Sequence, residues 1–160
     1  MRAKLLVAVV ATEAALVGAA LGAGPIRPTG SVTLEDSNGS AGAHPVALTF
    51  TMHYEMQCGR PGAGPFSVRV PEGFTLPASI PARDVLLDGK TPPSVIRSGR
   101  SLAVGIPTQT GVICDVIGPG VLTVQFKRAA GIGNAASPGS YSFRISVDGH
   151  VSATAALRLI

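Results

Sequence analysis

The stretch Val-Ala-Leu-Thr-Phe-Thr-Met-His-Tyr-Glu-Met, residues 46–56, alternates between two kinds of residue. Its even-numbered members are all large and apolar or aromatic, and its odd-numbered members are small or polar. Successive side chains of a strand point to opposite faces of a sheet, so this stretch predicts a half-buried β-strand. Met52 and Met56 are therefore expected to face the core, and His53 is expected to face solvent.

Similar but shorter runs, separated by turn residues, fill the chain on both sides of residues 46–56. They predict strands at residues 31–35, 66–70, 84–87, 94–97, 101–106, 121–127, 139–147 and 151–159. Ser98-Gly99 is interpreted as a two-residue hairpin turn, in which glycine supplies a positive φ. Helical periodicity is absent from this region, so the expected fold is all-β, an antiparallel Greek-key sandwich of about eight or nine strands.

The N-terminal 23 residues have the composition of a secretory signal peptide. Arg2 and Lys4 supply positive charge, residues 5–10 are an unbroken apolar run, and residues 14–24 are Ala, Gly, Leu and Val. This order of charged, apolar and small segments is typical of exported proteins. Residues 1–23 are therefore predicted to be a signal helix that precedes the sandwich and is removed from it.

An uncleaved membrane anchor is the alternative for this segment. Glu13 argues against it, because an acidic residue at the centre of a spanning helix costs about 2.5–3.5 kcal/mol. Cleavage is expected near residues 20–23, and residues 24–160 have the length of one domain. The protein is then secreted or held in the cell envelope, and it contacts a membrane only through the signal segment before cleavage.

Charge and aromatic content limit the classes of partner. Removing Arg2, Lys4 and Glu13 changes the formal charge from +4 to +3, and the chain has no Trp. Without a dense basic cluster or stacking aromatics, no nucleic-acid partner is expected. Basic residues at strand ends or beside turns predict a mildly basic surface, for which ordinary solvated charges are the favoured interpretation and attraction of anionic cell-wall polymer is the alternative. These residues are Arg69, Arg97, Arg100, Lys127 and Arg128.

Several motifs resemble one known family. They are Val-Pro-Glu-Gly-Phe-Thr-Leu-Pro-Ala-Ser-Ile at 70–80, Asp-Val-Leu-Leu-Asp-Gly at 84–89, Val-Leu-Thr-Val-Gln-Phe at 121–126, Ala-Gly-Ile-Gly-Asn at 130–134 and Pro-Gly-Ser-Tyr-Ser-Phe at 138–143. Together they are similar to immunoglobulin-like repeat modules of secreted bacterial surface proteins. The resemblance implies an immunoglobulin-like sandwich with a structural or adhesive role and no shared catalytic site. This chain differs in having one copy, two cysteines and Gly133-Asn134-Ala135 where the family often has Asn-Pro.

Cys58 and Cys114 are the only cysteines. Export places them in an oxidising compartment, which favours a disulfide between them; two unpaired buried thiols are the alternative. A bond closing a loop of about 57 residues adds about 4 kcal/mol on the chain-entropy account. Redox catalysis usually needs closely spaced cysteines, and this pair is far apart in sequence.

Chemistry-bearing side chains occur together around residues 44–58. His44, Met52, His53 and Met56, with Cys58 nearby, suggest copper or zinc because exported copper proteins use sulfur and imidazole ligands. Strand alternation separates Met52 from His53, so metal binding is only a remote alternative. The chain also lacks a Gly-x-Ser-x-Gly motif, and the prediction is a protein that is not an enzyme and carries no cofactor.

A secreted, non-catalytic structural or adhesive protein is the favoured interpretation, with cell-wall polymer or another extracellular protein as partner. A glycan-binding or cell-wall-binding module is the main alternative. Sugar-binding faces commonly use exposed aromatic rings, and here alternation predicts that Tyr54 and Tyr141 are buried. Phe74, in a loop, is the one aromatic residue expected to be available.

Overall fold

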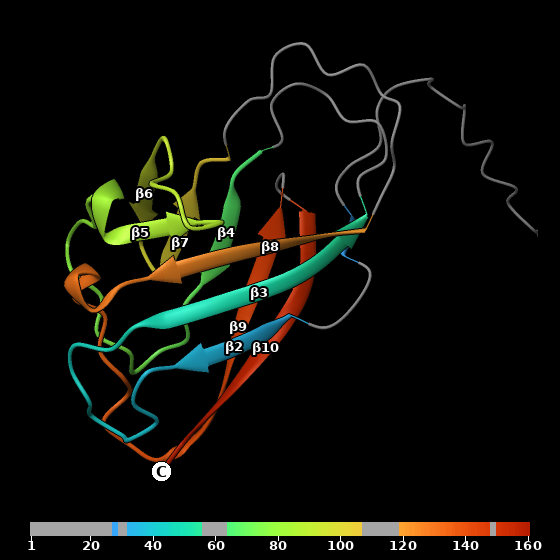
Figure 1. Cartoon of the computed structure of the whole chain (residues 1–160). Coiled ribbons are helices and arrows are strands. Elements are labelled where there is room, and N and C mark those ends of the chain that lie inside the picture. Colours follow the sequence, from blue (N-terminus) through green and yellow to red (C-terminus); the bar gives the residue numbers. More distant parts are fainter. Residues whose placement is uncertain (1–26, 29–31, 56–63, 107–118, 148–149) are drawn as a thin grey trace, which may run out of the picture.

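The computed structural model describes residues 27–28, 32–55, 64–106, 119–147 and 150–160. Within them the chain forms two antiparallel sheets that pack face to face (Figure 1), which confirms the all-β prediction. Two short 3₁₀ helices, η1 (Ala82–Asp84) and η2 (Arg128–Ala130), connect strands in this part of the chain. The same residues contain no helix long and apolar enough to cross a membrane.

The first sheet has the strand order β1-β3-β8-β5, with β2 also paired to β3. Its strands are β1 (Arg27–Pro28), β2 (Thr33–Asp36), β3 (Leu48–Glu55), β5 (Val85–Leu87) and β8 (Pro119–Phe126). β3 is the alternating stretch that predicted the fold, and β8 pairs with it along its whole length. β1 and β2 follow one another along the other edge of β3.

The second sheet has the order β10-β9-β4-β7-β6. Its strands are β4 (Phe66–Arg69), β6 (Val95–Ser98), β7 (Ser101–Val104), β9 (Gly139–Val147) and β10 (His150–Leu159). β10 also lies against β2 of the first sheet. After β10, the Ile160 N–H donates to Gly39 O at 3.0 Å, and Ile160 O accepts from the Ala41 N–H at 2.9 Å. These two hydrogen bonds attach the end of β10 to the loop that follows β2.

The core lies between the sheets, as the alternation predicts. Phe50 and Met52 are each 1% exposed, whereas Thr51 between them is half-buried and His53 is exposed. The ring of Phe50 has three aromatic neighbours, one on its own sheet and two on the other. Their centroid distances are 6.2 Å to Phe126, 6.0 Å to Phe66 and 5.7 Å to Phe143. This aromatic cluster holds the two layers together.

Strand bounds differ from the prediction where turns interrupt pairing. β3 begins at Leu48, because Val46 makes only an isolated bridge to Ile132. In the β6-β7 hairpin, Ser98 pairs with Ser101, so the two loop residues are Gly99 and Arg100 instead of Ser98 and Gly99. Gly99 has φ of +58°, so glycine does supply the positive φ of the turn.

The expectation for Phe74 is wrong. Its side chain is only 3% exposed and packs edge-on against Tyr141 and Phe143, with ring centroids 5.2 and 5.1 Å away. Arg100 holds the loop in this position: its Nε donates to Val70 O at 3.0 Å and its Nη2 donates to Phe74 O at 2.9 Å. A loop residue has no alternation pattern, so only tertiary packing could reveal its burial.

Candidate functional site

One line of polar residues crosses the outer face of the second sheet. Strand pairing places Ser98, Ser101, Arg69, Arg144 and Thr154 side by side, one from each of β6, β7, β4, β9 and β10. We call these five residues the arginine row. The sheet places two guanidinium groups from adjacent strands next to each other, with a hydroxyl residue on either side of them.

Arg69 and Arg144 directly face each other across the β4-β9 pair. Both side chains are exposed, and neither has a hydrogen-bond or ion-pair partner among the described residues. Side chains that face each other on antiparallel strands have Cβ atoms about 4.5–5.5 Å apart, and like charges in these positions repel. The fold therefore retains an unfavourable pair of like charges on its surface. An anionic ligand bound between them would relieve this repulsion, so the pair is a candidate binding site.

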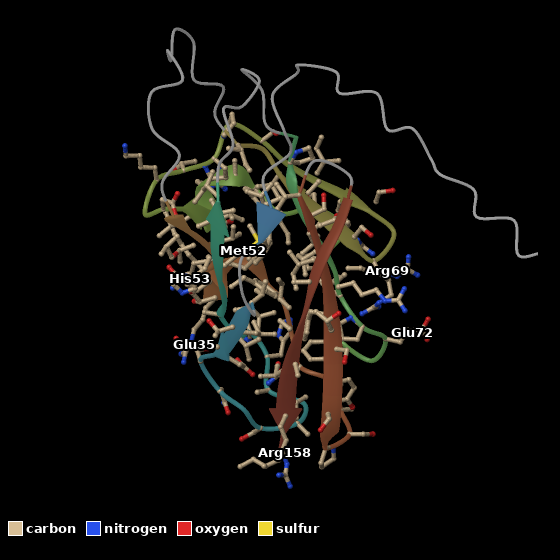
Figure 2. The ribbon with its side chains drawn as sticks, turned by 90° about the vertical axis from the view of Figure 1, so that its right-hand side faces the viewer. Glu35, Met52, His53, Arg69, Glu72 and Arg158 are labelled. Atoms are coloured by element: carbon tan, nitrogen blue, oxygen red, sulfur yellow. The ribbon has the colours of Figure 1, made fainter. Side chains whose placement is uncertain are left out.

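The strand residues next to the arginine row whose side chains are described are uncharged, and all but one are small; the exception is Ile96 on β6, which pairs with Ala103 and is 62% exposed. Next to it lie Ser67, Ala103 and Ser146, and on its other side lie Ser142 and Ala156, all at outward positions. Among the outward residues of this sheet whose side chains are described, none is Asp or Glu. Figure 2 shows Arg69 projecting away from the sandwich on the side opposite Glu35 and His53.

Two further charged residues border this face. Arg158 is exposed on β10, where it pairs with Ser140. Glu72 lies in the turn after β4, below Arg69 in Figure 2, and it forms no ion pair with any described residue. The face thus carries three arginines, Arg69, Arg144 and Arg158. The acidic residue that borders it, Glu72, belongs to a loop.

Three of the basic residues expected on a free surface are instead tied to backbone carbonyls. Arg100 bonds the 70–74 loop as described above. Arg97 Nε donates to Gly99 O at 2.9 Å, and its Nη1 donates to Pro77 O. Lys127 Nζ donates to Arg83 O at 2.8 Å. These groups stabilise loops, and their positive charge is only partly available to a ligand.

Sequence reasoning identified Arg69 but missed Arg144 and Arg158. Both lie at outward positions of strands that alternation located correctly, and that parity was the available signal. What the sequence could not supply is the strand order, which brings Arg144 beside Arg69, 75 positions earlier in the numbering.

The outer face of the first sheet has a different character. Thr33, Thr51 and Thr123 lie side by side across β2, β3 and β8. The adjacent line contains Glu35, Thr49 and Gln125, and Gln125 Nε2 donates to Thr49 Oγ1 at 3.4 Å. This face offers hydroxyl groups and one carboxylate, and no arginine or lysine lies on these strand positions.

The residues suggested as metal ligands do not come together in the part of the chain that the structure describes. Met52 is buried between the sheets, and His53 faces solvent from the first sheet, as Figure 2 shows. His44 packs over Gly133, where an added Cβ would come within 2.5 Å of its Cδ2. Met56 and Cys58 lie outside the described residues. Within the described residues, no three His, Cys, Asp or Glu side chains form a group able to hold a metal ion.

Two other expectations are affected differently. The proposed disulfide between Cys58 and Cys114 lies outside the described residues and stays a prediction. For sugar binding, Phe74 is buried, and Tyr141 is half-buried with its hydroxyl donating to Ser137 O at 2.7 Å. Neither ring is available as a flat platform for stacking a sugar.

Asn134 is the one fully buried polar side chain among the described residues, at 4% exposure. Its Nδ2 donates toward Asp36 Oδ2 at 2.6 Å, Asn38 O at 2.7 Å and Ser40 O at 3.0 Å. Its Oδ1 has no hydrogen-bond partner. We interpret this cluster as a clasp that joins the segment after β2 to the loop after η2.

Comparison with known proteins finds no family model that matches this chain, and no curated protein matches it either. The resemblance to immunoglobulin-like modules therefore remains a prediction from the motifs.

Proposed function

We propose that this protein is a secreted, non-catalytic adhesive β-sandwich of the cell envelope that attaches to anionic surface polymer through the outer face of its second sheet. One observation carries the proposal: exposed, unpartnered arginines from different strands gather on that face, and no acidic residue shares its described strand positions. The signal-like N-terminus supplies the compartment in which such a polymer is met.

An immunoglobulin-like Greek-key topology is part of the same proposal. In immunoglobulin constant domains, one sheet has the order A-B-E-D and the other contains C, F and G. The order β2-β3-β8-β5, with β4, β9 and β10 adjacent in the second sheet, follows this pattern when the seven strands are lettered in sequence. The β6-β7 hairpin is an addition between the fourth and fifth of them. The strand order supports the family resemblance, and such modules commonly serve as adhesive or spacing units.

Each ionic contact made by this face should contribute little binding free energy, whereas many contacts with one polymer should together give a high apparent affinity. An exposed ion pair is worth about 0.2–1 kcal/mol, so a single anionic group would bind poorly. A polymer presents many such groups at high local concentration, and multivalent contact raises the apparent affinity without any new kind of interaction. Binding should therefore depend on polymer length and fall as salt screens the charges.

Co-sedimentation of the purified protein with isolated cell envelopes tests the proposal. We expect binding at low salt, where the Debye length is about 30 Å at 0.01 M, and release near 1 M salt, where it is about 3 Å. Envelopes from which the anionic polymers have been extracted serve as the control and should retain little protein. Failure to bind at low salt, or binding that survives both treatments, would show that the proposal is wrong.

A further inference from the structure

We propose that Arg69 and Arg144 together form a phosphoryl-binding subsite, so that the polymer recognised is a phosphorylated glycan and not a carboxylated one. This inference rests on the proposed function and names its ligand class. It uses two features of these residues: they directly face each other across neighbouring strands, as no other described pair of basic residues does, and neither guanidinium group has a partner among the described residues.

The geometry of the pair favours a ligand that two guanidinium groups can share. Each guanidinium presents its donors as a planar fork that matches two oxygens of one anion. A carboxylate has two oxygens, and one fork occupies both of them. A terminal phosphoryl group has three strong acceptor oxygens and a charge of about −1.5 to −2 at neutral pH. It can therefore accept from both arginines and neutralise both charges.

Charge repulsion gives the same preference. Arg69 and Arg144 repel each other when the site is empty, and a dianion between them replaces that repulsion with two attractions. A single carboxylate leaves about one positive charge unbalanced. The preference for phosphate thus follows from the pairing of the arginines and should disappear when either one is removed.

Neighbouring residues leave room for a polymer at this position. Ser101 and Thr154 flank the pair in the arginine row and supply hydroxyl donors on both sides. Ser67 and Ser146, which face each other in the adjacent line, are small. A glycan chain could therefore lie along the face while its phosphoryl group reaches the guanidinium groups.

Three dextrans serve as probes: phosphorylated dextran carrying phosphomonoesters, carboxymethyl dextran of the same charge density and neutral dextran. Binding of the purified chain to each is measured at one fixed, low ionic strength. We expect the phosphorylated polymer to bind most tightly, the carboxymethyl polymer more weakly and the neutral polymer not at all. Equal affinity for the two charged polymers would overturn the phosphate preference and leave the proposed function in place.

The double variant Arg69→Gln/Arg144→Gln tests the residues. Its affinity for phosphorylated dextran should fall about tenfold, which is the loss that two exposed charge contacts can carry. The matched control is Arg83→Gln/Arg128→Gln, which removes the same charge from exposed residues of η1 and η2. The control should bind within a factor of about two of the original protein, and circular dichroism should show that both variants are folded.

Arg144→Lys separates fork geometry from charge. It keeps both positive charges, so binding to carboxymethyl dextran should be nearly unchanged, whereas the preference for phosphorylated dextran should shrink. If both double variants lose binding equally, the subsite assignment is wrong and only general charge matters. If the original protein binds envelopes in a salt-dependent manner but binds neither charged dextran, the ligand class is wrong while the proposed function stands.

Discussion

The two outer faces of the sandwich come from strands of the same kind and differ in chemistry. On the first sheet, Thr33, Thr51 and Thr123 form a neutral line beside Glu35. On the second sheet, the equivalent outward positions include Arg69 and Arg144 in direct apposition. Both sets of outward residues satisfy the alternation that the fold requires. The fold requires only that outward side chains be stable in water, so the chemical character of these side chains is free to suit a partner.

The inward positions show the contrast, because the buried residues among them pack in one core between the two sheets. Phe50 touches aromatic rings from β4, β8 and β9, so its size and apolar character are fixed by neighbours on both layers. An outward residue such as Thr51 has neighbours only within its own sheet. A change of charge should therefore be severe on the inside and mild on the outside.

The largest expected effect comes from placing charge on each side of β3. Phe50→Asp removes a buried ring, at about 3–5 kcal/mol, and buries an unpaired carboxylate, at about 3–5 kcal/mol more. The sum is comparable to the roughly 5–15 kcal/mol that stabilises a typical domain, so the variant should not fold stably. Thr51→Asp, one residue later, should cost no more than about 1 kcal/mol because it meets water. Far-ultraviolet circular dichroism and thermal melting measure both. Similar damage from the two changes would contradict the assignment of faces.

Asn134→Ala should have the next largest effect. The change removes the donor group directed at Asp36, Asn38 and Ser40, and leaves three acceptors at a partly buried site without it. At about 1 kcal/mol for each net hydrogen bond, the free energy of unfolding should fall by about 2–4 kcal/mol. Urea denaturation gives the value, with the exposed Ser140→Ala as control. A loss below 1 kcal/mol would show that the clasp contributes little to stability.

Moving the arginine pair to the other face sharpens the comparison further. Thr51 and Thr123 face each other across β3 and β8, so Thr51→Arg/Thr123→Arg reproduces the apposition of Arg69 and Arg144. In a protein that also carries Arg69→Gln/Arg144→Gln, we expect phosphorylated dextran binding to return only in part. Glu35 lies on the new face, and Asp88 accepts the Thr123 N–H at 2.7 Å, so both carboxylates compete for the new arginines. Complete recovery would show that the surroundings of the native pair are unimportant.

The smallest expected effect is a gain in stability from Arg144→Ser. Removing one of two facing like charges should raise the free energy of unfolding by about 0.2–1 kcal/mol in low salt. The gain should shrink as salt increases, and it should also shrink in phosphate buffer compared with chloride at equal ionic strength, because phosphate stabilises only the paired site. Differential scanning calorimetry in the two buffers measures the difference. A loss of stability in chloride would contradict the repulsion on which the subsite argument depends.

Much of the fold was predictable because strand alternation is a local property. Each of the strands β3, β8, β9 and β10 lies within about two residues of its predicted position, since a period of two is visible in the sequence of one strand alone. The exposure expected for Phe74 and the residues expected to form the β6-β7 turn are wrong, although Phe74 does lie in a loop. Arg100 is involved in both places. Its guanidinium group donates to the carbonyl oxygens of Val70 and Phe74, and these bonds join segments that no local sequence pattern connects.

The residues that face inward could be identified from the sequence alone, because burial on one side of a strand imposes alternation on the residues of that strand. The supply of charge at outward positions could be identified from it as well. Only the tertiary structure decided that Arg144 lies beside Arg69, that Asn134 reaches the segment after β2, and that Phe74 joins the core. These outcomes depend on strand order and loop packing, which arise from contacts between residues far apart in the chain and leave no periodic trace in it.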